Sequence, residues 1–401
     1  MSENGWPRPG RETLPWTSRM AEFLTPRQRA LLPSTYEAAV VPEIADAALT
    51  LPTRLAAAEA DAVAAVSRFD SDAASALLPF TPLLLRSESS ASSRIERLTA
   101  SARALVEAEF FAASSPRAKG NAPLIAANAK LMAAAADAGG DLGVEGLLAM
   151  HDVLLRPSAP DIAGKWRDGA VWIGGDDLSP AGALFVPPTA DAVPALIEDL
   201  LAFLRRDDIP AIAKAAIAHA QFETIHPFAD GNGRTGRALV HVVLADAGLF
   251  TNAVLPLSAR LLQDTAGYFA TLDEYRKGRT GPIVELFARS AIEAAELGTW
   301  AAGELESIRD DWRELVTGRA GTPDAPLADA FLTQPVMDVE YAAEAAACST
   351  AAARRSLERL ESAGIVIGYQ AEKRRRAWRA PDVLDLMDRV ASGLGRGDLP
   401  Q

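Results

Sequence analysis

Apolar residues recur at helical intervals along most of this chain of 401 residues, whereas β-branched runs are short and aromatic residues are sparse. Residues from about 36 to 117 show this helical spacing, with an Ala-rich run over 55–66. Two further helices are expected between 121 and 161, an amphipathic helix over 192–205 and a buried helix over 209–224. The pattern therefore predicts an all-α core.

The spacing changes to that of strands at one place. Val171–Gly175 and Ala183–Pro188 are short β-prone runs, and the polar residues 176–182 lie between them. Two such runs around a polar turn predict a β-hairpin. On local chemistry alone, this hairpin is a small ribbon on the surface of the core.

A stretch rich in Gly and Pro, residues 317–326, indicates a linker to a separate C-terminal domain. Beyond it, the spacing predicts three helices and then two strands around a basic turn. This order resembles a winged helix-turn-helix domain. The predicted helices are 327–333, 339–347 and 350–363, and the predicted strands are 365–370 and 376–380.

The charge of this C-terminal region leaves two kinds of partner open. Residues 349–379 contain eight Lys or Arg and three Glu, a net charge of +5. Neutralisation of phosphate charge by these residues would allow DNA docking. However, Ala351–Ala353 offer few side chains to read bases, and many winged helices dock proteins instead.

Composition excludes several classes of protein. No run of about eighteen apolar residues occurs, so no membrane span is expected. Residues 1–19 lack the basic head and apolar core of a secretory signal, which makes the cytoplasm the expected compartment. Cys348 is the only cysteine, which excludes an intramolecular disulfide and a Cys-rich zinc site. The net charge of −13 argues against nucleic-acid affinity of the chain as a whole.

The densest chemistry lies in the twelve residues His226–Arg237, which read His-Pro-Phe-Ala-Asp-Gly-Asn-Gly-Arg-Thr-Gly-Arg. Gly231 and Gly233 flank Asn232. The backbone at both glycines is expected to adopt positive φ and to turn consecutive N–H groups inward. Such a concave nest binds anions.

The charged residues of the same stretch fit a bound phosphate. Arg234 and Arg237 are three residues apart, which on a helix puts both guanidinium groups on one face near its N-terminus. Asp230 would repel a bare anion, but it suits a divalent cation that bridges two phosphates. His226 is the side chain of this stretch that can accept a proton near neutral pH. A Gly-Asn-Gly turn or an Arg pair alone is commonplace, but their joint occurrence between two apolar helices predicts a phosphate site with a proton acceptor.

This stretch also resembles the signature of the Fic family, His-x-Phe-x-Asp/Glu-Gly-Asn-Gly-Arg-x-x-Arg, and every position of that signature is present. The resemblance is strongest from Gly164 to Gly278. It implies an all-α Fic helical bundle in which the predicted hairpin is a flap over the active site. It also implies transfer of AMP from ATP to a Ser, Thr or Tyr hydroxyl of a protein substrate bound at the flap. ATP and Mg²⁺ are therefore the expected cofactors.

The resemblance assigns roles to single residues. His226 would be the catalytic base, and Asp230 would hold Mg²⁺ between the α- and β-phosphates. For Tyr268, an aromatic residue at helical spacing, packing in the core is as good an interpretation as contact with adenine. The residues implied to bind the nucleotide are Phe228, Gly231, Asn232, Gly233, Arg234, Arg237 and Tyr268.

A segment upstream resembles the N-terminal inhibitory helix of one Fic class. Ser92 is expected to cap a helix, and Glu96 lies four residues further on. Local chemistry alone favours a capped helix with a surface acid. Ser92 to Arg97 is similar to the inhibitory pattern Ser/Thr-x-x-x-Glu-Gly/Asn except at Arg97, where Gly or Asn would tolerate the end of a helix better. The resemblance implies that Glu96 pairs with Arg237 and occupies the guanidinium that would hold the γ-phosphate of ATP.

The other three histidines are expected to be structural. His151 lies on an apolar helix face with no carboxylate or second histidine spaced to join it. Neither His219 nor His241 has an evident chemical partner in the sequence.

Two other functions stay open. The same site with Glu96 in place could remove AMP from a modified protein, or a silent Fic-like core could belong to a DNA-binding regulator. The target protein, the preferred base and the oligomeric state, a homodimer included, cannot be read from the sequence. The expected domains are an N-terminal helical region with the inhibitory helix (1–118), a Fic core (119–316), the linker (317–326) and a winged helix domain (327–401).

Overall fold

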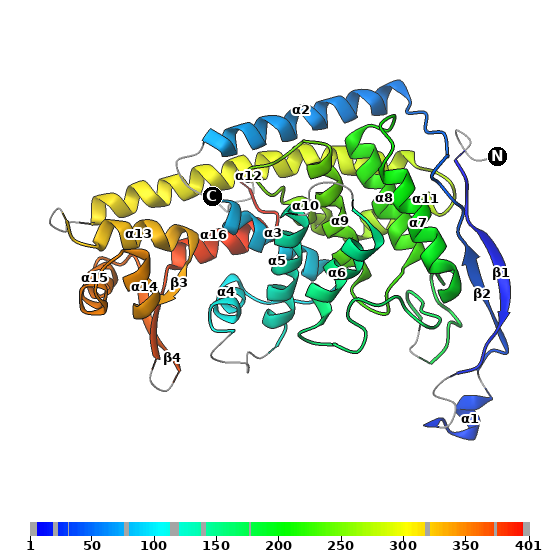
Figure 1. Ribbon diagram of the computed structural model, residues 1–401, viewed down its shortest axis with the longest axis horizontal. Coiled ribbons are helices and arrows are strands. Elements are labelled where there is room, and N and C mark those ends of the chain that lie inside the picture. The colour runs from blue at the N-terminus through cyan, green and yellow to red at the C-terminus, as the bar shows by residue number, and fades with distance from the viewer. Residues whose placement is uncertain are drawn as a thin grey trace. The chain divides into compact units, whose positions relative to one another are not determined.

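The computed structural model of the protein is mainly helical, with two small sheets in its described part (Figure 1). Contacts along the chain define two compact units. The first comprises residues 1–61, 137–247 and 266–289, and the second comprises residues 62–136, 248–265 and 290–401. The structure describes residues 6–18, 23–30, 32–75, 80–112, 120–137, 142–175, 178–316, 321–372 and 375–395.

A pair of buried helices forms the centre of the first unit. α8 (Ala211–Ile225) packs against α9 (Asn232–Asp246) and α7 (Val193–Leu204), and α6 (Val144–Leu155) packs against α7 and α9. Every residue of 215–225 is buried. The predictions of an amphipathic helix at α7 and a buried helix at α8 are confirmed.

A carboxylate from another helix supplies the cap that α8 lacks. Pro210 is the residue before α8 and provides no capping side chain. Buried Glu59, on α2 (Thr53–Ser75), accepts hydrogen bonds from the N–H groups of Ile212 (2.8 Å) and Ala213 (3.0 Å). These bonds satisfy N–H groups of the first turn, which have no partner within the helix. Burial raises the pKa of Glu59.

The N-terminal part of this unit contains an antiparallel ribbon. β1 (Gly10–Pro15) pairs with β2 (Thr35–Val40), with Gly10 opposite Val40 and Pro15 opposite Thr35. The helical prediction from about residue 36 onward is therefore wrong at β2. The cause is pairing with a strand some twenty residues earlier, which overrides the local helical pattern.

The predicted hairpin over residues 171–188 is confirmed. Ile173 and Phe185 form an antiparallel bridge, in which Ile173 N–H donates to the Phe185 carbonyl over 2.8 Å. The ribbon joins it, because Ala39 N–H donates to the Val186 carbonyl over 3.0 Å. Residues 176–177 of the predicted turn lie outside the described residues. The remaining elements of the first unit are α1 (Pro26–Arg29), the 3₁₀ helix η3 (Ala190–Ala192), most of α11 (Thr265–Tyr275) and the start of α12 (Gly281–Leu315).

The second unit is also helical at its centre. α3 (Thr81–Ile95) packs against α4 (Ala102–Phe110), α10 (Leu257–Gln263) and α16 (Pro381–Ala391). Its remaining helices are α5 (Ala122–Asp137), the later parts of α2 and α12, α13 (Asp324–Thr333), α14 (Val339–Ala345) and α15 (Thr350–Ser362).

A three-stranded antiparallel sheet accompanies α13, α14 and α15. Its strand order is β3 (Val336–Asp338), β5 (Arg375–Arg379), β4 (Ile367–Glu372). The three helices and two strands predicted beyond residue 326 are therefore confirmed, with bounds that differ by a few residues. β3 was not predicted, because a strand of three residues leaves no periodic signal. α16 was also missed, although its buried residues recur at helical spacing.

Ser92 does not begin a helix. α3 starts at Thr81, with a proline in its first turn, and Ser92 lies buried inside it. The expected cap at Ser92 is therefore wrong, since Pro82 and the apolar residues after it start the helix earlier. Glu96 is the residue that closes α3, and Arg97 follows it with φ of 63°.

Arg97 thus adopts the left-handed conformation that glycine adopts without steric cost. We expect Arg97→Gly to raise the free energy of unfolding by about 1 kcal/mol, because a side chain in this conformation costs roughly 1–2 kcal/mol. Chemical denaturation measures the change. Ala363→Gly is the control, because Ala363 also closes a helix but has φ of −78°. An equal gain in both variants would contradict the explanation.

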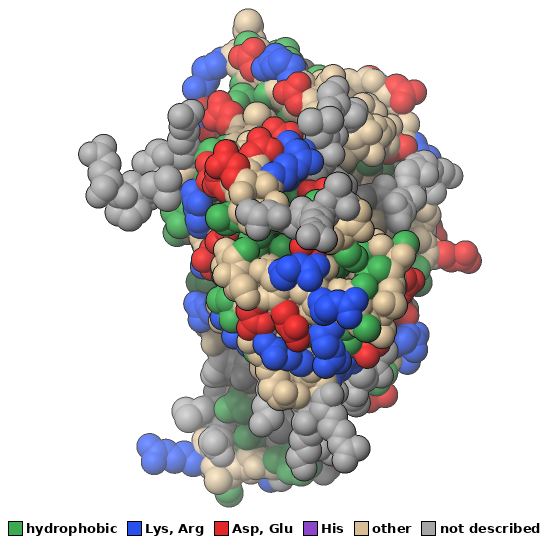
Figure 2. All heavy atoms as spheres, turned by 90° about the vertical axis from the view of Figure 1, so that its left-hand side faces the viewer, with side chains coloured by type: hydrophobic (Ala, Val, Ile, Leu, Met, Phe, Trp, Pro, Cys, Tyr) green, Lys and Arg blue, Asp and Glu red, His purple; other side chains and the backbone are tan. Residues whose placement is uncertain are grey.

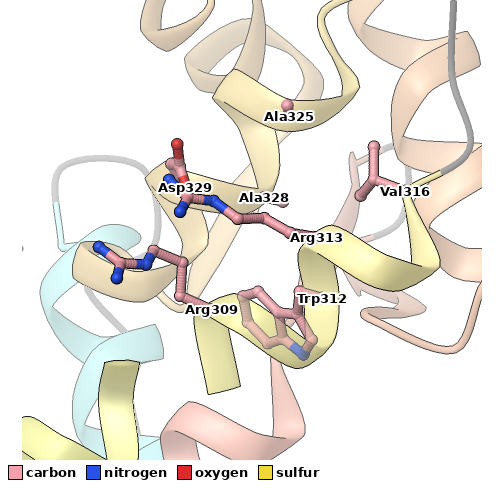
Figure 3. Close-up of a pocket in the computed structure, with 7 residues that line it drawn as sticks. All are labelled: Arg309, Trp312, Arg313, Val316, Ala325, Ala328 and Asp329. Atoms are coloured by element: carbon pink, nitrogen blue, oxygen red, sulfur yellow. The ribbon is translucent and has the colours of Figure 1, made fainter. Parts of the chain in front are cut away.

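A small hollow of about 90 Å³ lies within the second unit, between the end of α12 and α13 (Figure 3). Trp312 Nε1 donates to Asp382 over 3.0 Å, and Arg309 pairs with Asp310. No candidate site residue from the sequence lines it.

None of the described helices has the length and apolar character needed to cross a membrane.

Candidate active site

The loop between α8 and α9 turns at two residues with left-handed backbone. His226 closes α8 with φ of 51°, and its N–H donates to the Phe222 carbonyl over 2.8 Å. Gly231 precedes α9 with φ of 78°. A Cβ atom at Gly231 would lie 3.0 Å from Leu154 Cδ2, so both conformation and space require glycine there.

Asn232 holds the loop in shape through the backbone of Phe228. Its side-chain amide donates to the Phe228 carbonyl (2.9 Å) and accepts from the Phe228 N–H (2.9 Å). The Phe228 ring is fully buried, stacked at 3.7 Å on His151 and at 5.1 Å on Trp166. Nucleotide contact by either residue stays a prediction.

His151 supports the same loop from α6. The Gly164 N–H donates to His151 Nδ1 over 3.0 Å, so the ring proton lies on Nε2, which is 3.0 Å from the Asp230 carbonyl and donates to it. Burial lowers the pKa of His151, which favours this neutral form. The buried hydrogen bonds of His151 agree with its interpretation as structural, although its partners are not evident in the sequence.

Arg167 ties the loop to the hairpin. Its buried guanidinium donates to the carbonyls of His226 (2.8 Å), Gly169 (3.0 Å) and Pro188 (2.6 Å). Its backbone N–H donates to the Pro227 carbonyl over 3.0 Å. Burial lowers the pKa of Arg167 to about 10. The sequence placed Arg167 before the hairpin but did not reveal this bridging role.

Arg167→Lys would leave several of these carbonyls without a donor, because an ammonium cannot reproduce the planar fork of a guanidinium. We expect a loss of about 1–3 kcal/mol in the free energy of unfolding, the usual cost of an unsatisfied buried polar group. Thermal and chemical denaturation measure it. Arg156→Lys, at an exposed i,i+4 ion pair with Asp152, is the matched control with little expected loss. Equal stability of the two variants would contradict the bridging role.

The His226 side chain lies in a cationic environment that keeps it neutral. Burial first, and then the charges of Arg276 and Arg167, lower the pKa of His226 to about 3, while the backbone of Glu223 acts in the opposite direction. The side chain retains 20% of its surface exposed. A neutral imidazole that a substrate can reach is the form needed to accept a proton.

Arg276 connects this site to the hairpin. Its guanidinium lies 3.9 Å from the centre of the Phe185 ring, pairs with Asp273 over 3.0 Å and donates to the Glu223 carbonyl over 3.4 Å. Burial lowers the pKa of Arg276. Two arginines therefore attach the hairpin near His226. Arg276 binds the Glu223 carbonyl, and Arg167 binds the carbonyl of His226 itself.

The N-terminus of α9 lies where the sequence predicts an anion site, but the expected backbone needs one correction. Gly231 has positive φ, but Gly233 lies in the first turn of α9 with ordinary helical backbone. The expectation of positive φ at Gly233 is wrong, because the helix already starts at Asn232. N–H groups of a first turn and the helix dipole together favour an anion.

Arg234 and Arg237 both lie on α9 and are 3% exposed. Arg234 pairs with Asp230 over 3.3 Å. Asp230 also accepts the Gly231 N–H over 2.6 Å, and its side chain is 63% exposed.

Asp230 is suited to Mg²⁺ rather than to a cage of protein ligands. The described residues contain no cluster of three or more His, Cys, Asp or Glu that could hold a metal. Mg²⁺ typically keeps several waters and binds one or two carboxylates together with substrate phosphates. An exposed carboxylate next to the N-terminus of α9 fits that requirement.

Tyr268 and His219 lie together in the core. The Tyr268 hydroxyl is 2.6 Å from His219 Nε2, and Tyr268 is 1% exposed. Packing therefore accounts for Tyr268, and its contact with adenine stays a prediction. The expectation that His219 lacks a partner is wrong, because the tyrosine lies 49 residues further along the chain. His241 is also buried, as expected.

Burial, together with the charge of Arg237, lowers the pKa of His219 to about 3. The same ring in an unfolded chain has a pKa of about 6.5, so between these values only the unfolded state binds the proton. This ring therefore stabilises the fold above about pH 6.5, and the contribution is lost as the pH falls. His219→Gln should reduce the pH dependence of unfolding between pH 6 and 4 by about 1.4 kcal/mol per pH unit. Urea denaturation across this range measures it, and an unchanged slope would contradict the assignment.

Comparison with known proteins agrees with this geometry. Residues 141–244, which contain the loop and its flanking helices, match the model of the Fic/DOC family. The chain is 30% identical over 152 residues to protein adenylyltransferase fic-1 of Caenorhabditis elegans, covering 37% of this chain and 27% of that protein. It is 38% identical over 108 residues to a probable protein adenylyltransferase of Aquifex aeolicus, covering 26% of this chain and 33% of that protein. The chain thus spans a third or less of these relatives.

A solved structure shares the fold over more of the chain. The crystal structure of a Fic family protein from Desulfovibrio desulfuricans G20 covers 83% of this chain and 97% of its own, with a TM-score of 0.51 and 22% identity. At that identity the likeness shows the fold alone. The match to the Fic/DOC family model thus concerns residues 141–244, and the activity of the chain has to be argued from the site.

Proposed function

We propose that this protein transfers AMP from ATP to a Ser, Thr or Tyr hydroxyl of a target protein. The observation that carries this proposal is a neutral, partly exposed His226 one short loop before the N-terminus of α9. Several proteins similar to part of this chain are named protein adenylyltransferases, which supports the reaction class.

In the proposed reaction, His226 takes the proton of the target hydroxyl as its oxygen attacks the α-phosphorus of ATP. The new O–P bond forms as the P–O bond to pyrophosphate breaks. The N–H groups at the start of α9 would bind the phosphates, and Arg234 and Arg237 would stabilise charge on the departing pyrophosphate. Positioning and electrostatics contribute most of the rate in such a displacement.

Asp230 would hold Mg²⁺ beside the phosphates. The ion, when bound, supplies positive charge that offsets the negative charge of the phosphate oxygens. The protein's own part is to present the carboxylate, which Arg234 and the Gly231 N–H orient.

The protein substrate is proposed to bind at the hairpin. The hairpin is attached to the loop through Arg167 and to the end of α8 through Arg276. A segment held there would therefore be fixed relative to His226. Main-chain pairing with a hairpin tolerates many target sequences.

Glu96 is proposed to inhibit the enzyme by pairing with Arg237. The end of α3 supports this role. Arg97 departs from the Gly or Asn of the inhibitory pattern, yet it adopts the left-handed conformation that Gly or Asn would take there. A carboxylate competes with phosphate for the same guanidinium.

The C-terminal elements from α13 to α16 are proposed to form a winged helix that docks proteins rather than DNA. Three of its arginines pair with acids, which reduces the charge available to phosphates. On the face of the molecule that Figure 2 shows, Lys and Arg side chains are interspersed with Asp and Glu. The pairs are Arg359–Asp324, Arg375–Asp338 and Arg376–Glu361.

The proposal predicts opposite effects of two substitutions on self-modification with AMP. Glu96→Gly should raise transfer, because it frees Arg237 for phosphate. His226→Ala in the Glu96→Gly background should lower transfer by about 10²–10⁴-fold, the usual contribution of a general base. Intact-mass spectrometry after incubation with ATP measures the product.

Binding of ATP to both variants, measured by calorimetry, is the control and should change little on His226→Ala. Undiminished transfer by the double variant would contradict the assignment of the base. Equal transfer by wild type and Glu96→Gly would contradict inhibition by Glu96.

A further inference from the structure

Glu223 places a buried carboxylate next to His226. It lies on α8, three residues before His226, and is 6% exposed. Its Oε2 atom is 3.8 Å from His226 Nδ1. A carboxylate at this distance from an imidazole favours a proton on the facing nitrogen.

The crossing of α8 and α9 is shaped to hold this carboxylate. A Cβ atom at Gly236 would lie 3.0 Å from Glu223 Oε1, 3.0 Å from Phe222 Cδ1 and 3.2 Å from His219 Nδ1. Gly236 has ordinary helical backbone within α9, so its conformation does not require glycine. A side chain at this position would crowd the Glu223 carboxylate.

The Glu223 carboxylate puts a negative charge 3.8 Å from His226, a ring that also has two cations around it. Arg276 donates to the Glu223 carbonyl and pairs with Asp273, and Arg167 donates to the His226 carbonyl. Both cations disfavour an imidazolium at His226. A general base must nevertheless become an imidazolium during the reaction. An anion that faces Nδ1 of the ring stabilises this imidazolium.

We infer that the Glu223 side chain is a positioning residue that keeps the His226 proton on Nδ1 and leaves Nε2 free to take the proton of the target hydroxyl. This inference rests on the proposed function for its catalytic part. The geometry of Glu223, His226 and Gly236 carries the tautomer assignment by itself. The backbone carbonyl of Glu223 is unchanged by substitution, so variants isolate the side chain.

The test is nuclear magnetic resonance of protein labelled with ¹⁵N at histidine. The chain has four histidines, so substitutions of His151, His219 and His241 assign the signal of His226. Long-range ¹H–¹⁵N spectra at pH 7 distinguish a proton on Nδ1 from one on Nε2. We expect wild type to carry it on Nδ1, and Glu223→Gln, whose amide can donate to Nδ1, to shift it at least partly to Nε2.

Transfer of AMP provides the second readout. Glu223→Gln and Glu223→Ala should lower kcat by about tenfold or more, the equivalent of one unit in the pKa of the base. Glu223→Asp, which keeps the charge, should restore part of the loss, whereas a residue that only packs would not show this order. Glu59→Gln is the matched control, because it removes another buried carboxylate bound to α8 and should leave the His226 tautomer unchanged.

The two readouts separate this inference from the proposed function. A His226 ring with the same tautomer in wild type and Glu223→Gln would overturn the inference, whatever the transfer activity. A shifted tautomer without AMP transfer in any variant would support the positioning role and contradict the proposed reaction. A kcat in Glu223→Ala equal to that of wild type would also overturn the catalytic part.

Discussion

The geometry of the candidate site depends on hydrogen bonds to the backbone of one short loop. Asn232 holds Phe228, His151 holds the Asp230 carbonyl, and Arg167 holds the His226 carbonyl. Each of these three side chains is buried. The shape of the loop therefore does not depend on the imidazole of His226 or on a metal at Asp230. These groups are left to serve chemistry, and their substitution should leave the loop folded.

A second constraint is the close crossing of α8 and α9. Ala residues on α8 and Gly236 on α9 let the two helices approach closely. That approach sets His226 at the end of one helix close to the N–H groups at the start of the next. It also buries Glu223 beside His226, where charge is weakly screened by solvent. The positions of His226, Glu223 and the N-terminus of α9 thus follow from a single packing arrangement.

The sequence predicted those parts of the structure that have a local cause. Periodic apolar residues predicted α7 and α8, and β-prone runs around a polar turn predicted the hairpin. The motif predicted a helix that follows the glycine-rich loop, and α9 already begins at Asn232, inside the expected nest. Local chemistry could not predict partners that are distant in sequence.

Arg167 lies 59 residues from the carbonyl of His226, and His151 lies 79 residues from Asp230. β2 became a strand because a distant segment pairs with it, which no window of local sequence reveals. The start of α3 was missed although its signal is local. Ser92 is a good capping residue type, but an earlier proline and apolar run had already begun the helix.

The proposed function requires that AMP, which contains the α-phosphate of ATP, becomes attached to protein. The most direct measurement is incubation of the protein with ATP labelled at the α-phosphate and, separately, at the γ-phosphate, followed by detection of label on protein. We expect label on protein from ATP labelled at the α-phosphate and none from ATP labelled at the γ-phosphate, with release of pyrophosphate. Label from the γ-position would mean that the site transfers a phosphoryl group instead, and would contradict the account.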